Sequence, residues 1–228
     1  MEKILYPLWK ADSQDIESFR QSLLELVPAL ETAGARGLRL AVADADVAAG
    51  KDLCQAKLCD AADGLLSVWL DSNVYREKVE AVFGDRCDRY HAYLVTESAP
   101  LVHDQPAGAR MEGWTQVVFL VRPEGMSEAD WLTVWQGSHT SIAIETQSTF
   151  AYRQNVVVRA LSEGAPVIHA IVEESFPTAA LDSPHAFFDA GSDEELQAQL
   201  GKMMESCARF IDFERINVTP MSDYLLRA

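Results

Sequence analysis

The sequence predicts an α+β protein made of two βαββαβ units whose sheets pack against each other. Two observations carry this prediction: the same order of elements occurs twice, and amphipathic helices alternate with short apolar strands. The segments 3–9 (KILYPLW) and 115–121 (TQVVFLV) open the two copies. In each copy a helix, two strands, a second helix and a last strand follow.

The element boundaries follow from apolar periodicity and from breakers. In the first copy we expect helices at 13–33 and 72–84 and further strands at 36–47, 64–71 and 88–96. In the second copy we expect helices at 127–146 and 192–212 and strands at 149–160, 166–174 and 214–219. The segment 101–113 contains Pro106, Gly108 and Gly113 and is typical of a linker. It divides the chain into repeats 1–107 and 108–228.

The helices are marked by apolar stripes and by their ends. The first helix carries an apolar residue every three or four positions, namely Ile16, Phe19, Leu23, Leu26, Val27 and Leu30. Gly34 follows it in the manner of a C-terminal cap. Ser127 with Asp130, and Ser192 with Glu195, have the spacing of an N-terminal capping box.

Composition excludes several classes of partner and site. The chain has 228 residues and a formal net charge of −16, which would repel nucleic acid and anionic membrane surfaces. No apolar run approaches the roughly 18 residues of a membrane span, so we expect a cytoplasmic protein with no membrane partner. The four cysteines form no CxxC pair, which favours reduced thiols and argues against a structural zinc site.

The two copies differ in where ionisable residues occur. An approximate alignment of the copies places three leucines opposite ionisable residues: Leu24 opposite His139, Leu66 opposite His169 and Leu70 opposite Glu173. A buried charge without a partner is costly, so such replacements indicate either solvent access or a function. We therefore expect the larger cavity on the side of the second copy, although drift at exposed positions would give the same pattern.

Three features of the second copy bear on function: a strand with two ionisable residues, a tryptophan pair and a single helix histidine. His169 and Glu173 share one face of a predicted strand, so both could point into the space between the sheets. Trp131 and Trp135 stand four residues apart on a predicted helix, a spacing that is more often core packing than a ligand platform. A single helix histidine such as His139 is likewise more often structural than catalytic.

The segment Trp131–Asn155 (WLTVWQGSHTSIAIETQSTFAYRQN) resembles the EthD family. A tryptophan-rich helix ends in a histidine, and a strand closing in Tyr-x-Gln-Asn follows. The stretches 113–123 and 216–226 fit the same resemblance. That family often shows two adjacent histidines at the helix end, whereas here Ser138 precedes His139. The resemblance covers the second half well and the first half only by topology.

The resemblance implies a dimeric α/β barrel, here formed within one chain by two ferredoxin-like units, with a ligand cavity between the sheets. Proteins of this superfamily use such cavities for cofactor-free cyclisation and isomerisation, for haem-dependent oxidation and for haem breakdown. Fold alone does not decide among these reactions. A homodimer is a further expectation.

Three functional hypotheses follow. The first is an enzyme that carries out cofactor-free proton transfer on a small apolar or aromatic carbonyl compound. His139 or His169 would then be the acid or base, with Glu173 beside it; the substrate would contact Trp135, Tyr152, Asn155 and Gln116. The second is an accessory protein that binds a similar ligand without turnover. The third is a haem-dependent monooxygenase or peroxidase relative with His139 or His169 as the axial ligand, although the sequence offers no obvious arginines to hold the propionates. No metal site is expected.

Overall fold

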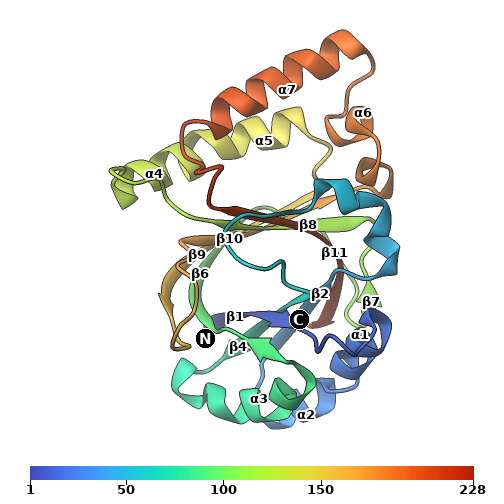
Figure 1. Ribbon diagram of the computed structural model, residues 1–228, viewed down its shortest axis with the longest axis vertical. Coiled ribbons are helices and arrows are strands. Elements are labelled where there is room, and N and C mark those ends of the chain that lie inside the picture. Colours follow the sequence, from blue (N-terminus) through green and yellow to red (C-terminus); the bar gives the residue numbers. More distant parts are fainter.

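The computed structural model describes residues 1–228 as a closed antiparallel β-barrel with helices against two opposite sides (Figure 1). The first half contributes four main strands and three helices: β1 (Glu2–Trp9), α1 (Ile16–Leu24), α2 (Val27–Thr32), β2 (Gly37–Val42), β4 (Gly64–Leu70), α3 (Arg76–Phe83) and β6 (Tyr93–Leu101). Their order in the sheet is β2-β4-β1-β6, and every neighbouring pair is antiparallel.

The second half repeats this strand order. Its main elements are β8 (Trp114–Leu120), α4 (Glu128–Val134), the π-helical turn η4 (Trp135–His139), α5 (Thr140–Thr146), β9 (Ala151–Ala160), β10 (Ala170–Phe176), α7 (Asp193–Cys207) and β11 (Ile216–Arg227). The sheet order is β9-β10-β8-β11, again antiparallel throughout.

Shorter elements connect these parts. They are η1 (Ala45–Leu53), β3 (Gln55–Ala56), η2 (Asn73–Tyr75), η3 (Gly84–Arg86), β5 (Arg89–Tyr90), β7 (Ala109–Arg110), η5 (Thr178–Leu181) and α6 (Pro184–Phe187). No helix is both long and apolar enough to cross a bilayer.

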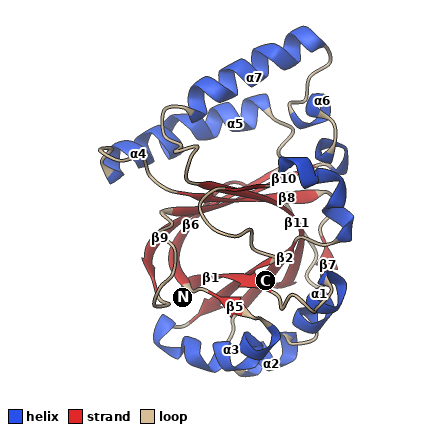
Figure 2. Ribbon diagram, viewed as in Figure 1, coloured by secondary structure: helices blue, strands red, loops and turns tan.

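The closed barrel confirms the prediction of an α+β protein whose two halves form one barrel within the chain. The halves are joined more closely than two separate sheets packed face to face would be. Strand β6 pairs with β9, and β11 pairs with β2, so hydrogen bonds cross both seams and one continuous sheet closes on itself (Figure 2). Because closure pairs all eight main strands on both sides, it leaves none of them as an unpaired edge.

The predicted first helix, 13–33, is two helices in the structure. Helix α1 begins after Asp15, whose carboxylate accepts the Ser18 backbone N–H at 2.9 Å and so caps the helix. A second helix, α2, starts at Val27, with Pro28 in its first turn. Since proline donates no backbone hydrogen bond, it is tolerated at the start of a helix and interrupts a continuous one.

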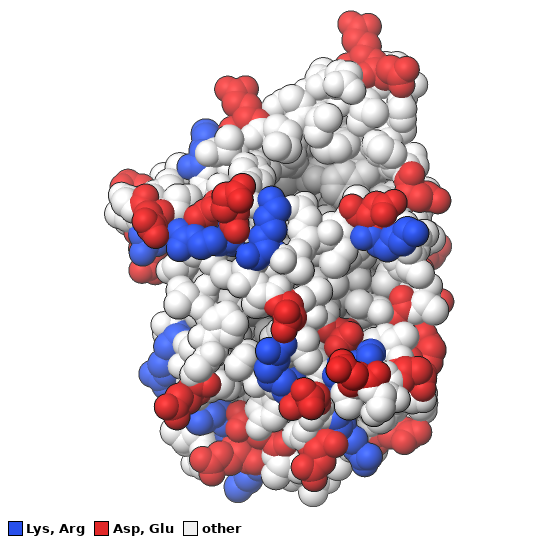
Figure 3. Space-filling model, in the orientation of Figure 1, with Lys and Arg blue, Asp and Glu red and all other residues white.

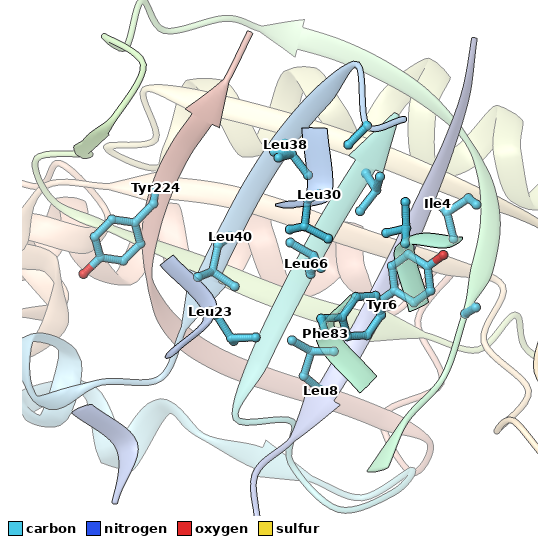
Figure 4. Packing of buried hydrophobic residues seen from close by; sticks show 14 of the residues in the cluster. Ile4, Tyr6, Leu8, Leu23, Leu30, Leu38, Leu40, Leu66, Phe83 and Tyr224 are labelled. Atoms are coloured by element: carbon cyan, nitrogen blue, oxygen red, sulfur yellow. The ribbon is translucent and has the colours of Figure 1, made fainter. Parts of the chain in front are cut away.

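The helix-facing side of the first half is a closed apolar core. Seventeen buried residues pack between α1–α3 and the sheet, among them Tyr6, Phe19, Leu40, Leu66 and Phe83 (Figure 4). Tyr6 and Phe83 meet edge to face, with ring centroids 5.0 Å apart.

The barrel interior is filled by a second apolar cluster and by a buried ionic cluster. The apolar residues come from strands of both halves and include Leu5, Val95, Phe119, Ile171 and Met221. The family resemblance led us to expect a ligand cavity between the sheets, but packed side chains occupy this space instead.

The ionic cluster joins the halves across the barrel. Lys3 Nζ contacts Glu97 at 2.5 Å and Glu173 at 3.3 Å, and Arg153 Nη2 bridges Glu173 at 3.1 Å and Asp223 at 2.7 Å. Arg39 Nη1 completes the cluster at 2.7 Å from Asp223. Three cations thus meet three carboxylates, so no charge of the cluster is left without a partner.

We predict that Glu173→Gln destabilises the protein by about 3–5 kcal/mol, because Lys3 and Arg153 would keep their buried positive charges with one carboxylate fewer. Urea unfolding at pH 7 measures this loss. The matched control is Asp71→Asn, which breaks the exposed pair with Arg36 and should cost at most about 1 kcal/mol. Equal losses in the two variants would contradict a structural role for the cluster.

Candidate functional site

The candidate site is a pocket of about 330 Å³ outside the barrel, between the sheet of the second half, the turn η4 and helix α7. Its floor comes from β8, β9, β10 and β11, and its roof comes from Met203, Met204 and Cys207 of α7. Asp52 and Leu53 of η1 bring the first half to one side of it. Figure 3 shows a hollow of uncharged atoms on this face, below the helices at the top.

The lining is mainly apolar and rich in aromatic rings. Sixteen of its 22 residues are hydrophobic, and six are aromatic: Trp135, Tyr152, Phe187, Phe188, Phe210 and Phe213. No lysine or arginine lines it. Such a lining favours a flat or elongated uncharged molecule that is held mainly by burial, with a few polar groups to orient it.

The first half has no such pocket at its own sheet–helix interface. The strand pair β1–β4 can be aligned with the pair β8–β10 by matching Glu2, the first residue of β1, with Trp114, the first residue of β8. Ile4 then corresponds to Gln116, and Val68 corresponds to Glu174. Ile4 and Val68 are fully buried in the apolar core of the first half. Two polar residues in the second half thus occupy positions that are apolar in the first.

Glu174 is the most unusual group in the pocket. Glu174 is buried, and its carboxyl oxygen Oε1 has no hydrogen-bond partner in the protein. Burial raises the pKa of Glu174 to about 8, because no cation nearby offsets the lost hydration. At neutral pH the side chain is therefore mainly an uncharged acid that can donate a hydrogen bond to a ligand.

His139 lies in the same lining and is also uncharged. Its Nδ1 is 2.9 Å from Ser206 Oγ, and its ring contacts Phe210 at a centroid distance of 4.6 Å. Burial, and to a lesser degree the charge of Arg209, lower the pKa of His139 to about 4. No hydrogen bond within the protein engages Nε2, which leaves it free for a ligand.

A π-helical turn positions His139 and Trp135. The predicted helix 127–146 runs through α4 and α5, but residues 135–139 between them make the wider turn, a feature often found at functional sites. Thr140 Oγ1 donates to the Trp135 carbonyl at 3.0 Å and accepts from Gln154 Nε2 at 2.7 Å. Ser98 of β6 then donates to Gln154 at 3.0 Å, so a strand of the first half supports the turn.

Trp135 and Tyr152 form a fixed polar contact in the pocket wall. The Trp135 indole N–H donates to the Tyr152 hydroxyl at 3.1 Å. Tyr152 pairs with Glu174 across β9 and β10, and Gln116 pairs with Glu174 across β8 and β10. Gln116, Glu174 and Tyr152 therefore lie in one row across the sheet and line the pocket together.

The structure brings four of the seven residues proposed from sequence into this pocket, namely Gln116, Trp135, His139 and Tyr152. Asn155 and Glu173 lie instead in the ionic cluster, where Asn155 contacts Lys3 at 2.8 Å and Glu173 at 3.0 Å. Burial alone would raise the pKa of Glu173, but the charges of Lys3 and Arg153 hold it well below its usual range. A carboxylate held in this way is a poor proton carrier at neutral pH.

His169 lies outside the pocket as well. It is half-buried, its Nδ1 accepts the Arg122 backbone N–H at 3.1 Å, and its ring meets that of Trp131 at 6.3 Å. The sequence alignment that set Leu70 opposite Glu173 was out of phase, because Leu70 faces the helices and Glu173 faces the barrel interior. The alternation of side chains along the strand could have predicted the position of Glu174. Ala170 and Val172, four and two residues before it, face the helices, so Glu174 does as well.

The pocket does not have the groups that a metal ion or a haem would need. No three His, Cys, Asp or Glu side chains come close enough together to hold a metal. The lining also lacks the cations that would pair with two haem propionates. The residues present do not fit a haem.

The EthD domain family matches residues 123–214, from the turn after β8 to the turn before β11. This range contains Trp135, His139, Tyr152 and Glu174, whereas Gln116 and η1 lie outside it. No curated protein matches the chain.

Among solved structures, an anthrone oxidase-like protein is 15% identical, with a TM-score of 0.55 over 99% of this chain and 93% of its own. A protein described as a monooxygenase from Lactobacillus acidophilus NCFM is 8% identical, with a TM-score of 0.49 over 100% and 97%. A mutant chlorite dismutase from Candidatus Nitrospira defluvii is 11% identical, with a TM-score of 0.46 over 97% and 91%. The first of these similarities shows the fold and leaves the chemistry open.

We predict a pH-dependent stability that Glu174→Gln removes. The folded protein keeps the Glu174 proton up to a pKa of about 8, whereas the unfolded chain releases it near the ordinary value of 4.5. The stability linked to this group is therefore complete below pH 4.5 and is lost as the pH rises through 8. Urea unfolding at pH 5, 7 and 9 should show that the free energy of unfolding of the variant, relative to that of the wild type, increases by several kcal/mol as the pH rises.

The matched control for this experiment is Glu145→Gln, since Glu145 is exposed on α5 and pairs only with Lys202. Its stability relative to wild type should hardly change between pH 5 and 9. A difference between Glu174→Gln and wild type that stays constant with pH would show that Glu174 has an ordinary pKa.

Proposed function

Because residues 123–214 match the EthD domain, we propose that the protein is a small-molecule enzyme that transfers protons on an uncharged apolar carbonyl compound in the pocket beneath α7. The observation that carries this proposal is the unpartnered, buried carboxyl of Glu174, which lies in an aromatic lining together with the neutral imidazole of His139. Acid and base groups with opposite pKa shifts in one cavity are typical of proton-transfer sites.

The proposed reaction is enolisation. Glu174 gives its proton to the carbonyl oxygen while His139 Nε2 takes a proton from the carbon next to the carbonyl. The electron pair of the broken C–H bond becomes part of the new C=C bond, and the carbonyl π electrons take up the proton from Glu174. The pocket then contains a neutral enol, a carboxylate and an imidazolium. Its total charge stays zero throughout, which avoids the cost of a net charge in an apolar cavity.

Ionisation of the two residues is mutually favourable. A neutral imidazole with a pKa of about 4 is a weak base as long as Glu174 is protonated. As Glu174 becomes a carboxylate in the proposed step, its negative charge favours the imidazolium of His139. Ser206 Oγ can accept the Nδ1–H of His139, which leaves the Nε2 lone pair directed to the ligand.

The remaining polar residues orient the substrate. Gln116 stands beside Glu174 in the sheet and can donate to the carbonyl oxygen. Tyr152 receives the indole N–H of Trp135, so its own hydroxyl hydrogen is available to a ligand or to Glu174. These neutral donors would stabilise negative charge that develops on the oxygen.

Three further interpretations accompany this proposal: the tandem units, a homodimer and a cytoplasmic location. The repeated strand order supports the interpretation of the halves as tandem ferredoxin-like units with a boundary near residue 108. The homodimer and the cytoplasmic location expected from the sequence stay predictions. Light scattering of the purified protein tests the first of these, and fractionation of the source cells tests the second.

We predict that the wild type catalyses exchange of the hydrogens next to the carbonyl of 2-tetralone with D₂O, and that Glu174→Gln and His139→Gln each lower this rate by about 10²–10⁴-fold. Proton NMR at pH 7 follows the exchange directly. His139→Gln should keep a near-native unfolding temperature, because glutamine keeps a polar group at the site, whereas Glu174→Gln should follow the pH-dependent stability predicted above.

His185→Gln is the matched control, since His185 is half-buried and pairs with Asp193 away from the pocket. It should exchange at the wild-type rate. Binding of 2-tetralone to the wild type without any exchange would favour the accessory binding protein over the enzyme.

A further inference from the structure

A second space of about 340 Å³ adjoins the pocket and is not used by the proposed reaction. It lies between η1 of the first half and the segment η5–α6 of the second half. Four residues line both spaces: Asp52, Leu53, Phe187 and Phe188. The two spaces therefore meet at these side chains.

The direction from Glu174 to this outer space follows from the strand and its aromatic neighbours. Phe176 lies two residues after Glu174 on β10 and stacks on Phe187 at a centroid distance of 4.4 Å. Phe187 in turn contacts Phe188 at 5.1 Å. Phe176 itself is fully buried and lines neither space. Because Phe187 and Phe188 line both spaces, a molecule that begins at Glu174 can pass these two rings into the outer space.

Helix α6 and the segment η1, on the two sides of the outer space, each pack against other parts of the protein. The Phe187 carbonyl accepts the Ser148 backbone N–H at 2.9 Å, which ties α6 to the turn before β9. On the other side η1 approaches η5 so closely that a Cβ added at Gly50 would lie 2.7 Å from Leu181 Cδ2. The outer space is therefore bounded on both sides by segments that pack against the rest of the protein.

The charges near both spaces select against an anion. Neither lining contains a lysine or an arginine, and the chain as a whole carries a net charge of −16. The outer space has two exposed carboxylates, Asp52 and Asp182, at its rim. A ligand carboxylate would find no cation at either end and two negative charges at one of them.

We infer that the two spaces form one elongated ligand site, and that its ligand is an uncharged molecule with a carbonyl head beside Glu174 and an apolar tail that runs past Phe187 and Phe188 to η1. The inference rests on the proposed function for the position of the head. It adds the length of the ligand and a contribution of the first half to binding.

The test is the affinity of a series of straight-chain methyl ketones, from 2-hexanone to 2-tridecanone, measured by calorimetry at pH 7. Each methylene that enters the site should raise the affinity about fourfold, up to the chain length that fills the outer space. Dodecanoate should bind at least about tenfold more weakly than 2-tridecanone, which has the same alkyl tail, because the charge of dodecanoate has no partner in either lining.

Ala49→Trp should shorten the chain length at which the affinity stops rising, since Ala49 is exposed and lines the outer space. The matched control is Ala48→Trp, because Ala48 is equally exposed but faces a different depression on the surface. It should leave the series unchanged. If the tryptophan variant does not fold, Ala49→Phe replaces it.

An affinity that stops rising at the same chain length in wild type and in the Ala49 variant would overturn the inference and leave the proposed function intact. Tight binding of dodecanoate would also overturn it. The proposed function fails separately, when Glu174→Gln binds the short ketones as tightly as the wild type and exchanges their hydrogens at the same rate.

Discussion

The buried ionic cluster is the constraint on which the rest of this structure depends. Lys3, Arg39 and Glu97 come from the first half, and Arg153, Glu173 and Asp223 come from the second. Their charges cancel only when the two halves meet in one register, because each carboxylate must reach a cation on another strand. The cluster therefore explains how one chain closes its eight main strands into a barrel with hydrogen bonds across both seams.

A filled barrel leaves the proposed binding site on the outside of the sheet. With the ionic cluster and the apolar residues of the interior in place, the space for a ligand is found between the sheet and its covering helices. The two halves use that space differently. The first half fills it with a closed apolar core, whereas the second half leaves a pocket with Glu174, Gln116 and His139 in its wall. One half thus contributes mainly stability, and the other carries the polar groups that chemistry requires.

The sequence predicted the order of the elements well, because apolar periodicity and helix caps depend on local chemistry. It also named His139, Trp135, Tyr152 and Gln116, which the structure brings into one pocket. It proposed Glu173, whereas the structure places Glu174 in the pocket. Neighbouring strand residues point to opposite faces of the sheet, and the strand pattern alone did not show which face borders the pocket. The position of the pocket outside the barrel depends on long-range pairs such as Lys3 with Glu173, 170 residues apart, which no local pattern reveals. The π-helical turn at 135–139 could not be predicted from the sequence for the same reason, since Gln154 and Ser98 support it from distant strands.

The central claim is that the ligand lies outside the barrel and that its carbonyl oxygen meets a protonated Glu174. A crystal structure of the complex with 2-tetralone, grown near pH 7, tests this most directly. The account predicts that the ligand lies between the sheet and α7, with its oxygen within about 3 Å of a Glu174 carboxyl oxygen. A ligand bound inside the barrel beside Glu173, or at the helices of the first half, would contradict it.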